Sequence, residues 1–170
     1  MIRLSAAILT FIVLVVIQVS FVQSLPYPFS ATPILFVFAI FLYQYVSLNQ
    51  AIWWILFGGF FFDLLGIGTI PLETFAYGAS AFVMSLCARH LFSNRSYYGL
   101  AATTLLGLAT LTLVEIVIMM LLNIFTAPVL IPQDLLFGRL WGMLLALPML
   151  LILFPLADPI RRMIRLLMNP

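Results

Sequence analysis

The sequence predicts an all-α fold, a bundle of six helices that crosses a membrane, and three observations predict it. Of the 170 residues, 65% are apolar and 7% are charged, a composition that contact with lipid requires and that a soluble globular domain does not need. Apolar runs of about 20 residues, the length that spans a bilayer, recur along the chain. The arginines, a residue type that collects in cytoplasmic loops, fall mostly on one side when six crossings are counted. We therefore expect a single integral membrane domain over residues 1–170.

Six apolar runs reach or approach the spanning length between charged residues, prolines or turn residues. They cover residues 4–22, 33–47, 51–65, 72–92, 99–125 and 138–157, and a short basic tail follows over 158–170. The first run follows Arg3 and lacks a clear cleavage site, so we interpret it as a retained helix and not as a signal peptide. Pro26 and Pro28 follow this run and resist its continuation. The second and third runs are separated only by the short polar segment 48–50.

The arginines also predict the orientation of the bundle. Six crossings place Arg139 on one face and the other six arginines on the opposite face, which is expected to be cytoplasmic. These six are Arg3, Arg89, Arg95, Arg161, Arg162 and Arg165. Both termini are therefore expected in the cytoplasm. The last three arginines alternate with apolar residues after the sixth run, which is typical of a basic membrane anchor or of a short interfacial helix on anionic lipid.

Small residues at helical spacing predict the faces on which the helices pack. In lipid there is little hydrophobic drive between helices, so close approach at small residues stabilises their contact. Such residues are Gly78, Ala81, Ser85 and Ala88 in the fourth run, Gly99, Thr103 and Gly107 in the fifth, and Gly138, Gly142 and Ala146 in the sixth. We expect these faces to pack within one bundle, and a dimer interface is the alternative.

One acidic residue lies well inside an apolar run. Glu115 is in the fifth run, on the same side as Gly107, and an ionisable group at a helix centre costs about 2.5 to 3.5 kcal/mol to insert. We therefore expect Glu115 to face protein. Two interpretations stay open: a protonated tie between helices, with Asn123 as a candidate partner, or an intramembrane coupling or ligand site.

Two more acidic residues flank the break between the third and fourth runs. Asp63 ends the third run, where it meets the unfavourable negative pole of that helix, so it needs a specific partner. The backbone amides of residues 66–71 and the Arg139 side chain are the candidates. Glu73 lies at the favourable positive pole of the fourth run, and Asp134 is expected to be solvated. We expect Asp63, Glu73 and Arg139 to form a polar cluster at the outer surface.

Composition and motifs also predict several absences. The net charge of +2 is spread too thinly for a phosphate-binding patch, so no nucleic-acid partner is expected. Cys87 and His90 are too few for a disulfide or a Cys/His metal site. No Gly-x-Ser-x-Gly motif with a partner histidine is found, and Asp63 makes no credible aspartyl dyad with Asp134 or Asp158. We expect no catalysis, no metal and no cofactor.

The segment 58–77, GGFFFDLLGIGTIPLETFAY, resembles the central signature of the rod-shape-determining MreD family. In that family a glycine-containing apolar helix ends in an aspartate, and a small-residue turn, a Pro-Leu-Gly-like step and a helix with an early aromatic residue follow. The matching positions are Asp63, Gly66, Gly68 and Pro71. Glu73 stands where the family commonly has glycine. We therefore expect Gly66 or Gly68 to supply the turn geometry that this glycine provides in the family.

The resemblance implies a non-catalytic inner-membrane component of the bacterial cell-elongation machinery that contributes to rod shape. The implied partners are MreC and the glycosyltransferase and transpeptidase that build lateral peptidoglycan, together with membrane lipids. The resemblance also implies a bundle similar to the substrate-binding component of energy-coupling-factor vitamin transporters. It therefore supplies a rival function, a small-molecule-binding subunit with Glu115, Asn123 and the outer cluster around its pocket. An assembly chaperone without a ligand is a third alternative.

Overall fold

The chain is all-helical over the residues that the structure describes. The computed structural model describes residues 2–45, 48–66, 71–90, 96–125 and 133–168, and no strand occurs among them. The long helices are α1 (Ile2–Val16), α2 (Ile34–Tyr45), α3 (Leu48–Leu65), α4 (Leu72–His90), α5 (Tyr97–Phe125) and α6 (Gln133–Met168). Two short elements lie between α1 and α2: the π-helical segment η1 (Ile17–Val22), which continues α1, and the 3-10 turn η2 (Phe29–Ala31). The predicted all-α class is confirmed.

The second and third helices are separate, as predicted, but the third begins at Leu48 and not at residue 51. Segment 48–50 forms the first turn of α3, and the side chains of Asn49 and Gln50 are exposed there. Polar residues are tolerated in a first helical turn because its backbone N–H groups have no partner within the helix.

Two helix starts also differ from the prediction. α5 begins at Tyr97 and not at residue 99 because Ser96 caps it: its Oγ accepts from the Gly99 N–H at 3.2 Å, and its carbonyl accepts from the Leu100 N–H at 3.0 Å. α6 begins at Gln133, which puts Asp134 in its first turn and not in the preceding loop. An acidic residue is favourable there because the positive pole of the helix lies at its N-terminus.

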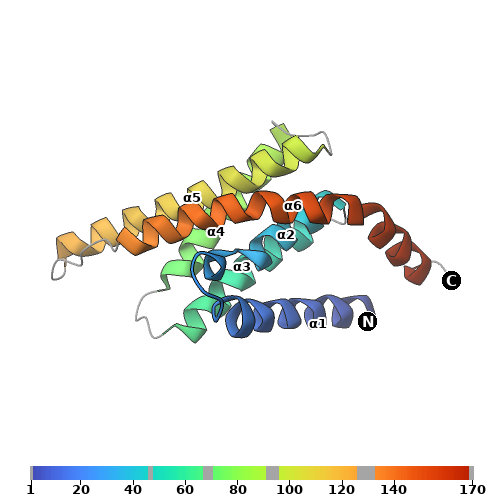
Figure 1. Ribbon diagram of the computed structural model, residues 1–170, viewed down its shortest axis with the longest axis horizontal. Coiled ribbons are helices and arrows are strands. Elements are labelled where there is room, and N and C mark those ends of the chain that lie inside the picture. Colours follow the sequence, from blue (N-terminus) through green and yellow to red (C-terminus); the bar gives the residue numbers. More distant parts are fainter. Residues whose placement is uncertain (1, 46–47, 67–70, 91–95, 126–132, 169–170) are drawn as a thin grey trace.

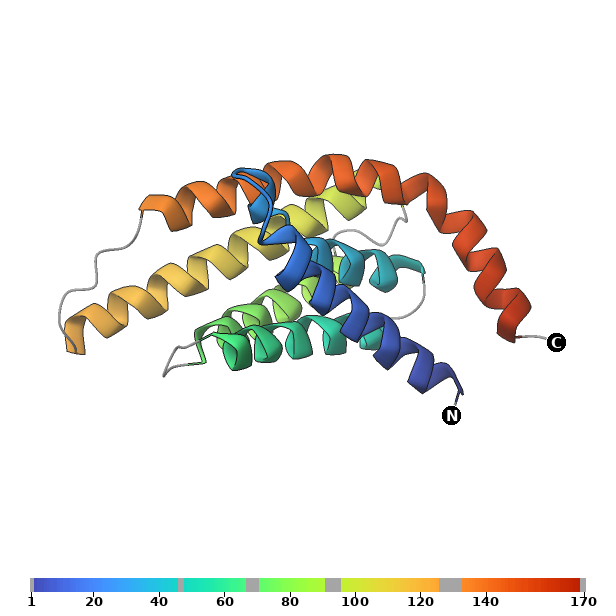
Figure 2. The same cartoon turned by 60° about the horizontal axis from the view of Figure 1, so that its bottom comes forward.

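The last helix is longer than predicted and bent. α6 continues to Met168, through the segment predicted as a tail, which is rich in the helix-forming residues Leu, Met and Arg. Figure 2 shows its C-terminal part turning away from the direction of its first part. Pro148 and Pro155 are the expected cause, because proline removes a backbone hydrogen bond and crowds the preceding turn. The side chains of Arg161, Arg162 and Arg165 lie outside the described residues.

The second helix forms the centre of the bundle. α2 contacts α1, α3, α5 and α6, and its most buried side chains are Leu35, Phe36, Val37, Ala39, Ile40 and Phe41, each at most 1% exposed. A helix that is apolar on all sides is stable only when it is covered on all sides. α4 packs between α3 and α5, and the remaining helices surround this core.

Both chain termini lie at one end of the bundle, and the candidate functional residues lie at the other. Figure 1 shows the N- and C-terminal ends on the same side. Successive long helices alternate in direction, so the ends of α1, α3 and α5 meet the beginnings of α2, α4 and α6 at the opposite end. We call that opposite end the outer end.

The outside of the bundle is unusually apolar. Among the side chains that the structure describes, large apolar ones point outward from every long helix except α2, for example Leu9 (64% exposed), Phe82 (66%), Leu113 (62%) and Ile152 (63%). An apolar surface of this extent is typical of contact with a membrane or a partner. Within the described residues, the segments Tyr97–Leu122 and Leu136–Leu156 are long and apolar enough to cross a membrane.

Most of the small residues predicted to mark packing faces do so. Ala81, Ala88, Gly107 and Gly142 are buried, and Gly78 and Ser85 are half-buried. A Cβ atom at Gly107 would approach Phe36 to 2.8 Å, and one at Gly142 would approach the Ala31 carbonyl oxygen to 2.8 Å. The prediction is wrong for Gly138, where a Cβ atom would have no neighbour within 4 Å, because this glycine faces a hollow at the edge of the bundle.

One close contact between helix backbones was not predicted as a packing position. A Cβ atom at Gly59 of α3 would lie 2.8 Å from the Glu73 carbonyl oxygen and 3.1 Å from the Thr74 Cα atom of α4. Both neighbours are backbone atoms, which cannot rotate away as a flexible side chain can. Only glycine therefore permits this approach of α3 to α4.

Gly59, at a tight helix contact, and Gly138, with no neighbour, give a matched pair of substitutions. Gly59→Ala is expected to destabilise the protein by about 1–3 kcal/mol because it overpacks a tight contact. Gly138→Ala is the control and is expected to be neutral or to stabilise by up to about 1 kcal/mol through helix propensity. Thermal unfolding in detergent measures both, and equal midpoints for the two variants would contradict the close approach.

Candidate functional site

A side chain of α3 caps the first turn of α4. The Asp63 carboxylate accepts from the backbone N–H groups of Glu73 (to Oδ1, 3.0 Å) and Thr74 (to Oδ2, 2.6 Å), and the Thr74 hydroxyl donates to the same Oδ2. A capping side chain normally belongs to the residue before the helix and bonds the same two N–H groups. Asp63 performs this role from the neighbouring helix.

Proline explains why the cap comes from another helix. Pro71 occupies the capping position, because its carbonyl accepts the first helical hydrogen bond of α4 from the Phe75 N–H at 3.3 Å. Its side chain carries no oxygen, so it satisfies none of the N–H groups that a helix start leaves open. Gly59 lies one turn before Asp63 on α3 and lets the two helices approach closely enough for the carboxylate to reach.

The beginning of α2 is capped in the same way. The Val37 N–H donates to the Pro33 carbonyl at 3.0 Å, which again places a proline at the capping position. The amide of Gln18, a buried residue of η1, donates from Nε2 to the Thr32 carbonyl at 2.9 Å and accepts at Oε1 from the Leu35 N–H at 3.3 Å. At each of these two helices, a proline occupies the capping position and a polar side chain from the preceding helix forms the capping hydrogen bonds.

An arginine of α6 joins two acidic residues from other helices. Arg139 donates from Nε to Glu115 Oε2 at 2.9 Å and from Nη2 to Glu115 Oε1, and the same Nη2 donates to Glu73 Oε1 at 3.1 Å. The two-point contact with one carboxylate is the geometry that guanidinium groups favour. The Glu115 side chain is fully buried, whereas Arg139 and Glu73 are 29% and 27% exposed. The arrangement links α4, α5 and α6 through charge.

The polar groups border a cavity at the outer end of the bundle. The cavity has a volume of about 500 Å³. Its polar lining comes from Gln18, Gln23, Ser30, Asp63, Glu73, Tyr77 and Arg139, and the remaining lining residues, among them Val19, Leu35, Phe36 and Phe62, are mostly apolar. We call this space the outer cavity. It brings together side chains from η1, α3, α4 and α6.

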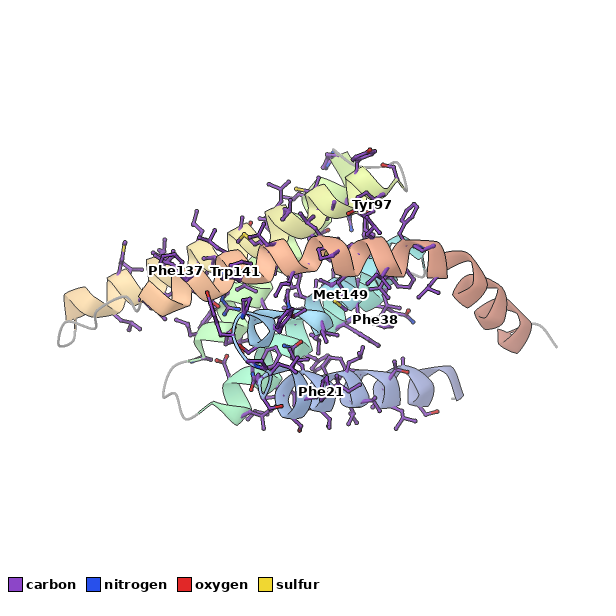
Figure 3. The ribbon with its side chains drawn as sticks, viewed as in Figure 1. Phe21, Phe38, Tyr97, Phe137, Trp141 and Met149 are labelled. Carbon is purple, nitrogen blue, oxygen red and sulfur yellow. The ribbon has the colours of Figure 1, made fainter. Side chains whose placement is uncertain are left out.

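A second hollow lies beside it at the edge of the bundle. Tyr27, Ser30, Ala31, Phe137, Gly138 and Trp141 line this space, and the rings of Tyr27 and Trp141 pack edge to face with centroids 6.5 Å apart. Figure 3 shows Phe137 and Trp141 projecting from the first half of α6. Aromatic side chains of this kind are typical of a membrane interface.

The three residues of the predicted outer cluster do lie together, and the structure decides between the two partners that the sequence left open for Asp63. Asp63, Glu73 and Arg139 all border the outer cavity. Asp63 does not pair with Arg139: it bonds the amides of Glu73 and Thr74, which lie beyond the predicted 66–71 segment, because the tight contact at Gly59 brings the start of α4 within its reach.

Glu115 faces protein as predicted, but its partner was not foreseen. The sequence suggested a neutral acid tied to another helix, and the structure pairs the carboxylate with the Arg139 guanidinium. Arg139 reaches it because α5 and α6 run side by side in opposite directions (Figure 1). The side chains of Asn123 and Asp134 and the whole of Gly68 lie outside the described residues, and Gly66 is exposed just after the end of α3.

Several residues of the site were missed in the sequence. Gln18 is polar within an apolar run before a Thr-Pro step. Ser80, which does not line the outer cavity, lies within an apolar helix, where its Oγ donates to the Gly107 carbonyl at 2.7 Å. An unexplained polar residue within an apolar run is the signal that would have found both. Thr74 and Tyr77 carried no such signal. Among the described residues, no group of three His, Cys, Asp or Glu side chains could hold a metal ion.

The sequence matches no protein-family model, no curated protein and no solved structure. Inferences about function therefore depend on the residues and on the geometry described above.

The cap can be tested by graded substitution. Asp63→Ala leaves the Glu73 and Thr74 N–H groups without a partner and is expected to cost about 0.5–2 kcal/mol of stability. Asp63→Asn keeps one accepting oxygen and is expected to lose less stability than Asp63→Ala. Thermal unfolding in detergent measures both, and an Asn variant as unstable as the Ala variant would argue against capping and for a requirement for charge.

The buried ion pair can be tested by removing one partner and then both. Arg139→Leu leaves Glu115 buried without its cation and is expected to destabilise by about 3–5 kcal/mol. Arg139→Leu combined with Glu115→Leu removes both charges and is expected to restore most of the loss. Unfolding midpoints of the single and double variants report the coupling, and a double variant no more stable than the single one would rule it out.

Proposed function

We propose that this chain is a multi-pass protein of the bacterial inner membrane that crosses the bilayer six times with both termini in the cytoplasm. The apolar exterior supports this proposal, since lipid is the environment that such a surface requires. The common end of the two termini supports an even number of crossings. Arg3 and Arg89 lie at that end, together with the C-terminal part of α6 that carries Arg161, Arg162 and Arg165, which agrees with a cytoplasmic location.

Cysteine labelling tests this topology. In a Cys87→Ala background, Ser24→Cys at the outer end and Asn49→Cys at the opposite end are a matched pair, because both native side chains are exposed. A membrane-impermeant maleimide is expected to label Ser24→Cys in intact cells and Asn49→Cys only after the membrane is opened. The reverse pattern would invert the orientation, and labelling of both in intact cells would contradict six crossings.

For the cellular role, we propose a non-catalytic component of the cell-elongation complex that contributes to rod shape. The observation that carries this proposal is the α3–α4 hairpin, which is the segment that resembles the MreD family. Residues of this segment have linked roles there: Gly59 permits the close approach, Pro71 directly precedes α4 and Asp63 caps that helix. A motif whose members depend on one another in space is stronger support than the same letters in sequence. The proposed partners are MreC and the cell-wall glycosyltransferase and transpeptidase.

Depletion tests the cellular role. Cells depleted of the protein are expected to change from rods to spheres, and the wild-type chain is expected to restore rods while Asp63→Ala restores them poorly. Phase-contrast microscopy measures the aspect ratio, and copurification from membranes identifies MreC and the cell-wall enzymes. Cells that keep their rod shape after depletion would contradict the proposal.

The outer cavity favours a second candidate function, a small-molecule-binding subunit of an energy-coupling-factor type transporter. A space of about 500 Å³ with polar and apolar walls suits a small ligand. The two candidates make different demands on the purified protein. A transport subunit should retain a vitamin or similar molecule and copurify with an ATPase, whereas a morphogenetic protein should copurify with cell-wall proteins.

A further inference from the structure

The last helix is longer than one membrane crossing requires. α6 has 36 residues, whereas about 20 residues already span the apolar part of a bilayer. The part of α6 that is apolar enough to cross is Leu136–Leu156, and the helix continues beyond it to Met168. We call residues 157–168 the C-terminal segment. In the proposed topology this segment lies outside the hydrocarbon region, at the cytoplasmic surface.

The C-terminal segment also leaves the direction of the bundle. Figures 1 and 2 show it turning aside from the first part of α6, and no other described helix runs alongside it in either view. Asp158 and Pro159 stand at its beginning, and these residue types are favoured at the capping position and the first position of a helix. The sequence thus marks a new helical unit at the point where α6 emerges from its apolar stretch.

The residues of the C-terminal segment divide between two helix faces. Its apolar residues recur at the spacing i, i+3, i+4 and i+7, which places them on one face. They are Ile160, Met163, Ile164 and Leu167. The opposite face carries three basic residues and one acidic residue, namely Arg161, Arg162, Arg165 and Asp158. The segment is therefore amphipathic, with a net positive polar face.

This order of residues is more specific than a basic anchor. Anchoring by charge needs only arginines near the end of a crossing, in any register. An amphipathic helix with arginines on its polar face instead lies in the plane of the membrane interface, where acyl chains cover the apolar face and anionic headgroups attract the basic one. Position at the membrane surface, the turn away from the bundle and the two ordered faces all favour this arrangement.

We propose that the C-terminal segment is an interfacial helix that binds anionic phospholipid headgroups of the cytoplasmic leaflet. Guanidinium groups suit this partner because their paired N–H donors match the oxygens of a phosphate. The inference rests on the proposed membrane topology and not on the proposed role in cell elongation.

A fluorescent probe on the apolar face tests the arrangement. The full chain, in a Cys87→Ala background, carries an environment-sensitive fluorophore at Ile164→Cys. It is reconstituted in vesicles of phosphatidylcholine alone, or of equal amounts of phosphatidylcholine and phosphatidylglycerol. The anionic vesicles are expected to shift the emission to shorter wavelength and to increase quenching by a quencher in the acyl chains. The same probe at Ser24→Cys, which is exposed at the outer end, is the control and should change little.

An exchange of two residues separates the amphipathic helix from a basic anchor. Arg165→Leu combined with Leu167→Arg keeps the composition and the net charge but places an arginine on the apolar face. The exchange is expected to abolish the response of the Ile164 probe to phosphatidylglycerol. A response equal to that of the unexchanged chain would show that charge alone is sufficient and would overturn the proposal.

Native mass spectrometry of the full chain tests the headgroup preference. In micelles with equal amounts of phosphatidylglycerol and phosphatidylcholine, wild type is expected to retain phosphatidylglycerol preferentially. Replacing Arg161, Arg162 and Arg165 by glutamine should lower this preference at least about tenfold, since one basic residue near an anionic surface contributes about fivefold. The matched control replaces Arg3, Arg89 and Arg95 by glutamine and should keep most of the preference.

The outcomes separate this inference from the topology on which it rests. Maleimide labelling of Ser24→Cys and Asn49→Cys reports the topology independently of the C-terminal segment. The expected labelling together with an Ile164 probe that does not respond to phosphatidylglycerol overturns this inference alone. It is also overturned if the two triple variants lose the lipid preference equally. A reversed labelling pattern overturns the topology and this inference with it.

Discussion

The backbone N–H groups at the starts of α2 and α4 impose the constraint on which the rest of the structure depends. A proline whose side chain offers no acceptor occupies the capping position before each helix, and in an apolar environment each unsatisfied N–H group costs several kcal/mol. Gln18 and Asp63 supply the acceptors from the preceding helices. Each helix start is therefore complete only when its neighbour is in place, which couples secondary structure to tertiary packing at the outer end.

The charged residues follow from this arrangement. Because Asp63 is used by the start of α4, it is not available to Arg139, and the guanidinium is left to Glu115 and Glu73. The buried Glu115 carboxylate accepts two hydrogen bonds from the Arg139 guanidinium, and Glu73, which borders the cavity, accepts a third. The outer end thus combines fixed polar contacts, which stabilise four helices, with an open space beside them. The same set of residues therefore joins the helices and borders the cavity.

Much of the architecture was predictable because it depends on local or periodic features. Apolar runs gave the number of long helices, and the position of Glu115 on the Gly107 side of its helix gave its burial. Boundaries were less predictable: Ser96 begins α5 through a cap that the apolar pattern does not mark. Gly138 shows the same limit, because its spacing to Gly142 is typical of a packing face and yet α6 presents it to a hollow. Spacing identifies a helix face but not what lies opposite it.

By itself, the sequence determined the helical class, the apolar exterior and the gathering of Asp63, Glu73 and Arg139 at one end, since hydropathy and alternating helix direction are sufficient for all three. Only the tertiary structure decided which partner each charge has. Arg139 pairs with Glu115 and not with Asp63, because the close backbone contact at Gly59 places the Asp63 carboxylate at the amides of α4. That choice depends on how closely α3 approaches α4 at Gly59, and no residue pattern along the chain encodes such a distance.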